Sequence, residues 1–148
     1  MFRKFLWLSA PMILALALFS EGAQAMFARY SDAQLIETSA LIAVGTVTRI
    51  TKVVRPSDGR ERTVGIIEIE TLLKGAPGTN IARLDLPQRG VAIKSTDIHY
   101  KVGQKGLWFL RRVSQGPVAI YTADHPQRFV PFASAGPHIE GVRKFLKR

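Results

Sequence analysis

The segment LIAVGTVTRITKVVRPSDGRERTVGIIEIETLLK, residues 41–74, decides the fold of this chain. On both sides of its centre, β-branched and aliphatic residues recur at alternate positions, which is the pattern of a half-buried β-strand. The centre contains Pro56 and the dipeptide Asp58-Gly59, the strongest short signal for a tight hairpin turn. The segment therefore predicts two long antiparallel strands, one from residue 41 to the break at Arg55 and one over about residues 62–74.

A two-residue turn at Asp58-Gly59 also predicts which residues face each other across the hairpin. One face is then apolar, with Ile50 opposite Ile67, Thr48 opposite Ile69 and Val44 opposite Leu73. The other face places Arg49 opposite Glu68, an opposite-charge pair that supports this register. Glu68 and Glu70 could be a pair of catalytic carboxylates, but alternate acids beside a basic strand favour a solvated surface.

The rest of the chain adds further strands and a helix at each end. Turn residues separate expected strands over about residues 80–86, 107–113 and 118–123. The four consecutive apolar residues 107–110 indicate a strand covered on both faces, as at the closure of a barrel. Ser31 and Gln34 form the pattern of a capping box before a helix over about residues 32–38, and an amphipathic pattern follows Pro137. The fold class is therefore mainly β: a small five-stranded, OB-fold-like barrel with short terminal helices.

The N-terminal 25 residues have the pattern of a secretory signal peptide. Arg3 and Lys4 precede the apolar run 5–19, and small residues follow up to Ala25. The run is short for a membrane span and contains Pro11, so an uncleaved anchor is the weaker interpretation. Cleavage near Ala25 leaves residues 26–148 as a single domain, which we expect in the periplasm or secreted.

Composition limits the chemistry that this domain can perform. The chain of 148 residues has a formal net charge of +10 and no cysteine, which excludes zinc-finger sites and thiol catalysis. We find no catalytic or phosphate-binding motif, so the sequence favours a protein that is not an enzyme and predicts no cofactor and no metal ligand. Two Asp-His neighbourhoods, Asp97 with His99 and Asp124 with His125, could support a metal-dependent hydrolase only if they converge in one pocket.

Four segments carry a family resemblance. They are Asp32-Ala33-Gln34-Leu35-Ile36 with Ser39; Ile42-Ala43-Val44-Gly45-Thr46-Val47; Ile67-Glu68-Ile69-Glu70 with Leu73-Lys74-Gly75; and Gly103-Gln104-Lys105-Gly106-Leu107-Trp108-Phe109-Leu110. Together they resemble uncharacterised exported bacterial domains, similar to the OB-fold barrels of tissue inhibitors of metalloproteinases and netrin-like modules. The resemblance covers about residues 31–124 and implies a fold more than a function. Those inhibitors chelate metal through an N-terminal cysteine, a mechanism that a chain without cysteine cannot use.

Two groups of residues are candidates for ligand binding. Trp108 and Tyr121 lie near Arg111 and Arg112, and OB-fold barrels bind single-stranded nucleic acid on exposed aromatics beside basic side chains. The other interpretation places Trp108 in the barrel core. Four C-terminal cations could bind an anionic surface or simply keep the protein soluble: Arg143, Lys144, Lys147 and Arg148.

The sequence thus leaves three functional hypotheses. The preferred one is an exported, non-enzymatic binding module of the bacterial cell envelope, whose partner is a protein or an anionic envelope component, with possible membrane-surface contact through the C-terminal cations. The second is a single-stranded nucleic-acid-binding protein, which export makes less favourable. The third is a metal-dependent hydrolase.

Overall fold

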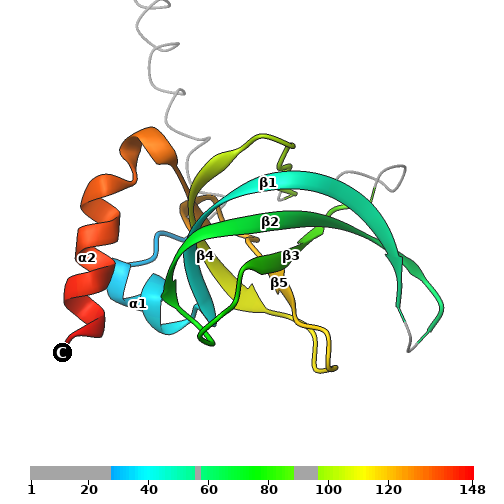
Figure 1. Cartoon of the computed structure of the whole chain (residues 1–148), viewed down its shortest axis with the longest axis horizontal. Helices are drawn as coiled ribbons and strands as arrows, with labels where there is room; N and C mark the ends of the chain where they lie inside the picture. Colours follow the sequence, from blue (N-terminus) through cyan, green and yellow to red (C-terminus); the bar gives the residue numbers. More distant parts are fainter. Residues whose placement is uncertain (1–27, 56–57, 89–96) are drawn as a thin grey trace, which may run out of the picture.

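The computed structural model describes residues 28–55, 58–88 and 97–148, and Figure 1 shows their arrangement. The elements in chain order are α1 (Asp32–Glu37), β1 (Leu41–Val54), β2 (Glu61–Lys74), β3 (Ile81–Leu86), β4 (Lys105–Arg112), β5 (Ile120–Thr122), the 3-10 turn η1 (Pro126–Arg128), β6 (Phe129–Pro131), the 3-10 turn η2 (Phe132–Ser134) and α2 (Gly136–Leu146). The predicted signal peptide and its cleavage near Ala25 lie outside the described residues. Within the described ranges, no helix is long and apolar enough to span a bilayer.

Five strands close into a ring. They follow the order β1-β2-β3-β5-β4, and β4 pairs back onto β1 from Leu41↔Leu110 to Thr46↔Lys105. The short strand β6 pairs with β4 outside this ring. The predicted fold class, a mainly β five-stranded barrel with short terminal helices, is confirmed.

The predicted register of the β1–β2 hairpin is wrong. Ile50 faces Gly65 instead of Ile67, and Glu68 faces Thr46 instead of Arg49. Ile69 faces Gly45 and Val44 faces Thr71, so neither Thr48–Ile69 nor Val44–Leu73 is a pair.

The turn and the bulges in both strands of the hairpin explain this difference. The Arg55 N–H donates to the Arg60 carbonyl at 2.8 Å, so four residues, not two, connect the strands. Gly59 adopts a left-handed conformation with φ 67°, which suits glycine at the end of such a turn. The register then shifts again between Val47 and Arg49, because a β-bulge adds one residue to β1 and bends it.

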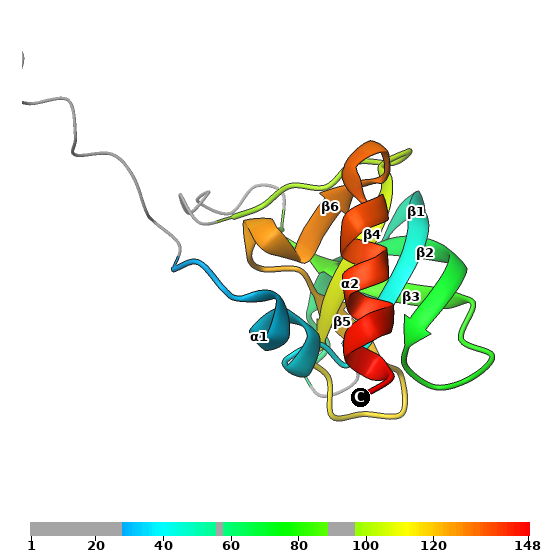
Figure 2. The ribbon, with the colours of Figure 1, turned by 90° about the vertical axis from the view of Figure 1, so that its left-hand side faces the viewer.

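The core has two layers, one on each face of β1 and β4. Trp108 and Leu110 point into the barrel, where they join Leu41, Val47 and other interior residues. The alternate residues of β4, Leu107 and Phe109, pack outward beneath the helices. Figure 2 shows α2 lying over the outside of the barrel beside β4. The expectation that residues 107–110 are covered on both faces is therefore confirmed.

Two glycines face each other where β1 and β4 close the ring. A Cβ on Gly45 would lie 2.5 Å from the Glu68 carbonyl oxygen, and one on Gly106 would lie 2.2 Å from the Val130 carbonyl oxygen. Any side chain at these positions would push β2 or β6 away. The two glycines thus permit the close approach of β2 to β1 and of β6 to β4 beside this seam.

Arg128 joins the end of α1 to the barrel wall. Its side chain is only 3% exposed, and its guanidinium donates to Thr38 Oγ1 at 3.1 Å, Ser39 Oγ at 3.2 Å and the Phe109 carbonyl at 3.2 Å. Burial lowers the pKa of this guanidinium, and Asp124, 3.6 Å from its Nε, opposes that effect. Arg128 therefore has a structural role that holds α1 in place.

Candidate functional site

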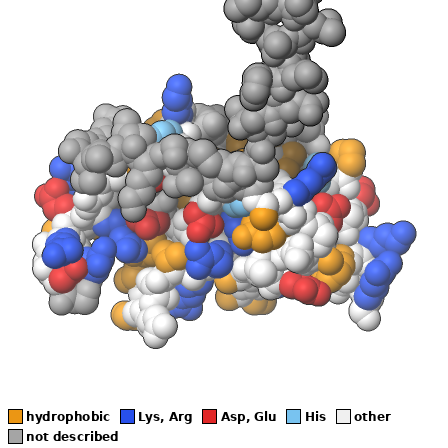
Figure 3. Space-filling model, turned by 180° about the vertical axis from the view of Figure 1, so that it is seen from behind, with side chains coloured by type: hydrophobic (Ala, Val, Ile, Leu, Met, Phe, Trp, Pro, Cys, Tyr) orange, Lys and Arg blue, Asp and Glu red, His pale blue; other side chains and the backbone are white. Residues whose placement is uncertain are grey.

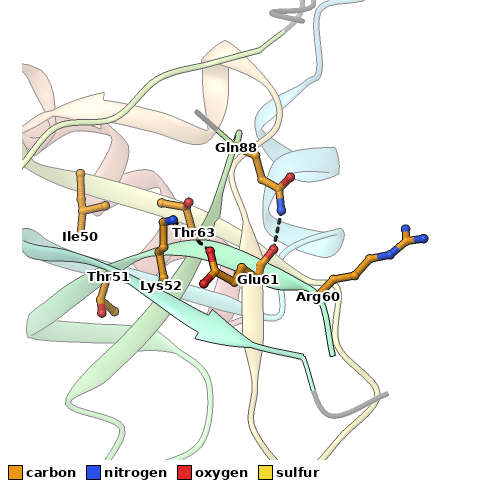
Figure 4. Close-up of a pocket in the computed structure, with 7 residues that line it drawn as sticks. All are labelled: Ile50, Thr51, Lys52, Arg60, Glu61, Thr63 and Gln88. Carbon is orange, nitrogen blue, oxygen red and sulfur yellow. Dashed lines mark hydrogen bonds and ion pairs between the residues drawn. The ribbon is translucent and has the colours of Figure 1, made fainter. Parts of the chain in front are cut away.

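A cleft of about 710 Å³ lies on the concave side of the β1–β2 hairpin, beyond the barrel (Figure 4). We call it the hairpin cleft. It is lined by Ile50, Thr51, Lys52, Arg60, Glu61, Thr63 and Gln88. At its inner end Ile50 packs against the barrel core. The outer part is polar and open to solvent.

Unequal strand lengths create this cleft. Strands β1 and β2 have 14 residues each, whereas β3 has only 6 and its pairing with β2 ends at Thr63↔Leu86. Beyond this point the hairpin continues as a two-stranded ribbon, which Figure 1 shows arching away from the barrel. The bulge at Val47/Arg49 contributes to the bend. The curvature of the ribbon forms the cleft.

The hairpin that forms the cleft carries an excess of positive charge, and two of its cations, Lys52 and Arg60, line the cleft. Residues 49–62 include five Lys or Arg and two Asp or Glu. Lys52 Nζ lies 2.9 Å from Glu61 Oε2, yet these side chains remain 70% and 61% exposed. Arg60 is 80% exposed and its nearest carboxylate, Asp58, is 3.8 Å from Nε. The Arg60 guanidinium can therefore bind an incoming anion without first losing a strong ion pair.

A second hollow of about 270 Å³ extends this basic surface around the hairpin. It shares Arg60 and Gln88 with the hairpin cleft and adds Arg55 and Arg62. Arg62 Nε lies 3.3 Å from Asp85 Oδ1, and burial raises the pKa of this carboxyl, against the effect of Arg62. Figure 3 shows basic side chains at the two ends of the molecule, over the hairpin and over the C-terminal helix. Further basic side chains lie between these two ends, so the hairpin is one of several regions that carry the positive charge.

The sequence-predicted ligand residues do not form an exposed aromatic surface. Trp108 is 0% exposed, and its Nε1–H donates to the Gly45 carbonyl at 3.0 Å. Tyr121 is half-buried and packs against the same core. Arg111 binds Asp124 at 2.6 Å, whereas Arg112 donates to the carbonyls of the following loop. A nucleic-acid base cannot stack on an indole ring that lies inside the barrel.

The four C-terminal cations all face solvent on α2 and the residues after it. Arg143 pairs with Glu140, three positions earlier on the same face of α2, at 3.1 Å. The apolar face of α2 is already occupied, since Val142 is 2% exposed and Ile139 and Phe145 pack on the outer core. This helix can therefore meet an anionic surface by charge, but its apolar side is not available for insertion.

Of the two Asp-His neighbourhoods, the aspartates line one hollow together, but the histidines do not line it. Asp97 and Asp124 both line a hollow of about 210 Å³ beside Tyr100, whose pKa is raised by burial. His99 is exposed and does not line this hollow, and the buried His125 ring contacts the Ala28 carbonyl at 2.8 Å. In the part of the chain that the structure describes, no three His, Cys, Asp or Glu residues could hold a metal ion.

The residues that line the hairpin cleft were missed by the sequence reasoning. Lys52, Arg60 and Gln88 lie on three different segments, and the alternation pattern does not show that the hairpin bends over the end of β3. The sequence feature that could have indicated this site is the concentration of five Lys or Arg residues around the Asp-Gly turn. Neither protein-family models nor curated proteins match the chain. The functional argument therefore depends on the shape and charge of this cleft.

Proposed function

We propose that this protein is a non-enzymatic binding module that holds an acidic partner in the hairpin cleft. The observation that carries the proposal is the open concave surface beside the solvent-exposed heads of Lys52 and Arg60. Such a surface attracts and orients negative charge over a broad area. The predicted signal peptide supports a place of action outside the cytoplasm, in the periplasm or after secretion.

The chemistry of the lining favours binding over catalysis. Glu61 is the single carboxylate among the described residues of its lining, and Lys52 holds that carboxylate in an ion pair at 2.9 Å. General acid–base catalysis uses positioned groups whose pKa values are tuned by burial or by neighbouring charges. The charged groups of the hairpin cleft are instead largely hydrated, which suits reversible recognition.

Binding of poly-L-glutamate, followed by isothermal titration calorimetry at several salt concentrations, tests the proposal. The double variant Lys52→Gln/Arg60→Gln removes two charges from the cleft, and Lys144→Gln/Lys147→Gln removes two from α2. If the cleft is the site, the first variant binds about tenfold more weakly, because two exposed contacts contribute about 1–2 kcal/mol together. The second variant binds nearly as the parent protein does.

Two results would contradict the proposal. One is the absence of poly-L-glutamate binding by the parent protein at low salt. The other is an equal loss in both double variants, which would assign the attraction to net charge alone. The variant Glu61→Gln provides an opposite check: removing the carboxylate that pairs with Lys52 should tighten binding.

A further inference from the structure

One edge of the β1–β2 ribbon has no paired strand in the part of the chain that the structure describes. Strand β1 pairs with β4 only as far as Thr46, and the last backbone contacts on this side join Val47 to Gly103 at 2.7 Å and Gln104 at 2.9 Å. Among the described residues, no strand pairs with this edge from Arg49 to Val54. The opposite edge of the ribbon, on β2, is occupied by β3 between Thr63 and Glu68.

The register identifies the backbone groups that this edge presents. Arg55 donates its N–H to the Arg60 carbonyl, so these residues form a hydrogen-bonded pair. In an antiparallel ladder such pairs alternate with pairs whose N–H and C=O point away from the partner strand. Ile50, Lys52 and Val54 therefore direct their backbone groups away from β2. Together they offer three donors and three acceptors, the pattern that an added strand requires.

The side chains at these positions favour an acidic occupant over a second copy of this chain. Lys52 is largely hydrated, Arg49 is exposed, and Val54 is 64% exposed. Pairing two copies edge to edge would bring the same cations of both chains together, and each chain has a net charge of +10. An extended segment with acidic residues at alternate positions would instead place its carboxylates together on the face of the ribbon that carries Lys52.

The geometry points to β-strand addition: an extended acidic segment of a partner protein pairs with β1 between Arg49 and Val54, at the rim of the hairpin cleft. This inference rests on the proposed function and names the form in which the acidic ligand binds. Main-chain hydrogen bonds to Ile50, Lys52 and Val54 supply affinity, while the cations select acidic segments.

A peptide of eight residues with alternating glutamate and valine, labelled with fluorescein, tests this inference by fluorescence anisotropy. The same peptide with lysine in place of glutamate should not bind. Two further peptides carry backbone N-methyl groups on all glutamates or on all valines. In a paired strand, the N–H groups of only one residue type, the glutamates or the valines, point toward β1. One methylated peptide should therefore bind at least tenfold more weakly, and the other should bind as the unmethylated peptide does. This comparison needs no change to the protein.

Two substitutions at Lys52 separate charge from backbone pairing. Lys52→Gln removes the charge and keeps the N–H, and we expect binding to weaken about threefold. Lys52→Pro also removes an N–H that points away from β2, so the β1–β2 hydrogen bonds are kept. We expect at least a further tenfold loss for the proline variant. Far-UV circular dichroism checks that both variants retain the parent fold.

The outcomes distinguish the two proposals. Equal binding of both methylated peptides, or equal affinities of Lys52→Gln and Lys52→Pro, overturns strand addition even when poly-L-glutamate still binds in the cleft. A dimer by analytical ultracentrifugation that Lys52→Pro dissociates would also overturn it, because the occupant of the edge would then be a second copy. Loss of poly-L-glutamate binding altogether contradicts the proposed function itself.

Discussion

Replacing Trp108 by phenylalanine tests whether this residue is part of the core or part of a binding surface. The indole ring is fully buried, with its centroid 4.3 Å from that of Phe129 and 5.0 Å from that of Tyr100. Its Nε1–H donates to the buried carbonyl of Gly45 at 3.0 Å. Phenylalanine keeps most of the ring contacts but cannot donate this hydrogen bond and is smaller.

Both losses contribute to the expected destabilisation. Leaving the Gly45 carbonyl without its donor costs about 1–3 kcal/mol. The smaller ring leaves a void of about 40 Å³, which costs about 1 kcal/mol more. We therefore expect the free energy of unfolding to fall by about 2–4 kcal/mol in Trp108→Phe, measured by urea denaturation with far-UV circular dichroism. Val118→Thr, at a position 50% exposed, is the control and should change it by less than about 0.5 kcal/mol.

A loss smaller than about 1 kcal/mol in Trp108→Phe would refute this reasoning. A second measurement uses a variant with Trp7→Phe, in which Trp108 is the sole tryptophan of the chain. Because the ring is inside the barrel, adding oligothymidine should leave its fluorescence unquenched. Strong quenching would instead place the ring at a nucleic-acid surface.

Three further predictions follow from other contacts. Arg128→Met removes three hydrogen bonds of a buried guanidinium and should lower the free energy of unfolding by about 3–5 kcal/mol in the same urea assay. Arg128→Lys should recover only part of this stability, because an ammonium group lacks the planar guanidinium fork. Lys105 Nζ lies 2.7 Å from the Glu70 carboxylate, and its hydrogen bond lowers the pKa of that carboxyl below 4.5. The ionised Glu70 therefore stabilises the fold above pH 4.5, and this stabilisation is lost as the pH falls through the lowered pKa. Carboxyl NMR should show the pKa of Glu70 rising in Lys105→Met. Glutamine at all four C-terminal cations should weaken binding to phosphatidylglycerol vesicles, while the exposed hairpin cations retain part of it. Binding of the parent protein should disappear at high salt because the apolar face of α2 is occupied; binding that survives high salt would contradict this.

The barrel was predictable because its strands carry local signals. The apolar run 107–110 indicated a strand covered on both faces, and the capping box of Ser31 and Gln34 is present at the start of α1. Strand β6 was not predicted, because its three residues are too few for alternation and one of them is Pro131. The hairpin itself was found at Asp58-Gly59, but its register depends on the turn length and on bulges that alternation does not reveal.

The candidate site was harder to predict than the fold. Its lining depends on a bend in β1 and on the point at which β3 stops, so residues far apart in sequence become neighbours only in three dimensions. The sequence offered two interpretations of Trp108: a ligand-binding aromatic, because an aromatic residue beside arginines is typical of stacking surfaces, and a residue of the barrel core, which its burial supports. It could not establish which face of the strand Trp108 occupies. Burial of that ring leaves the cations of the hairpin as the more accessible binding groups.

The seam between β1 and β4 also has a consequence for the time course of folding. Trp108 and Gly45, which hydrogen-bond across it, are 63 positions apart in the chain. Contacts of such long sequence separation carry a large loop-closure cost and are typical of proteins that fold slowly. During synthesis, strands β1 to β3 emerge first as an open meander with an unpaired edge on β1. Ring closure must wait for β4, so the nascent chain remains open for longer than a helical protein of this length.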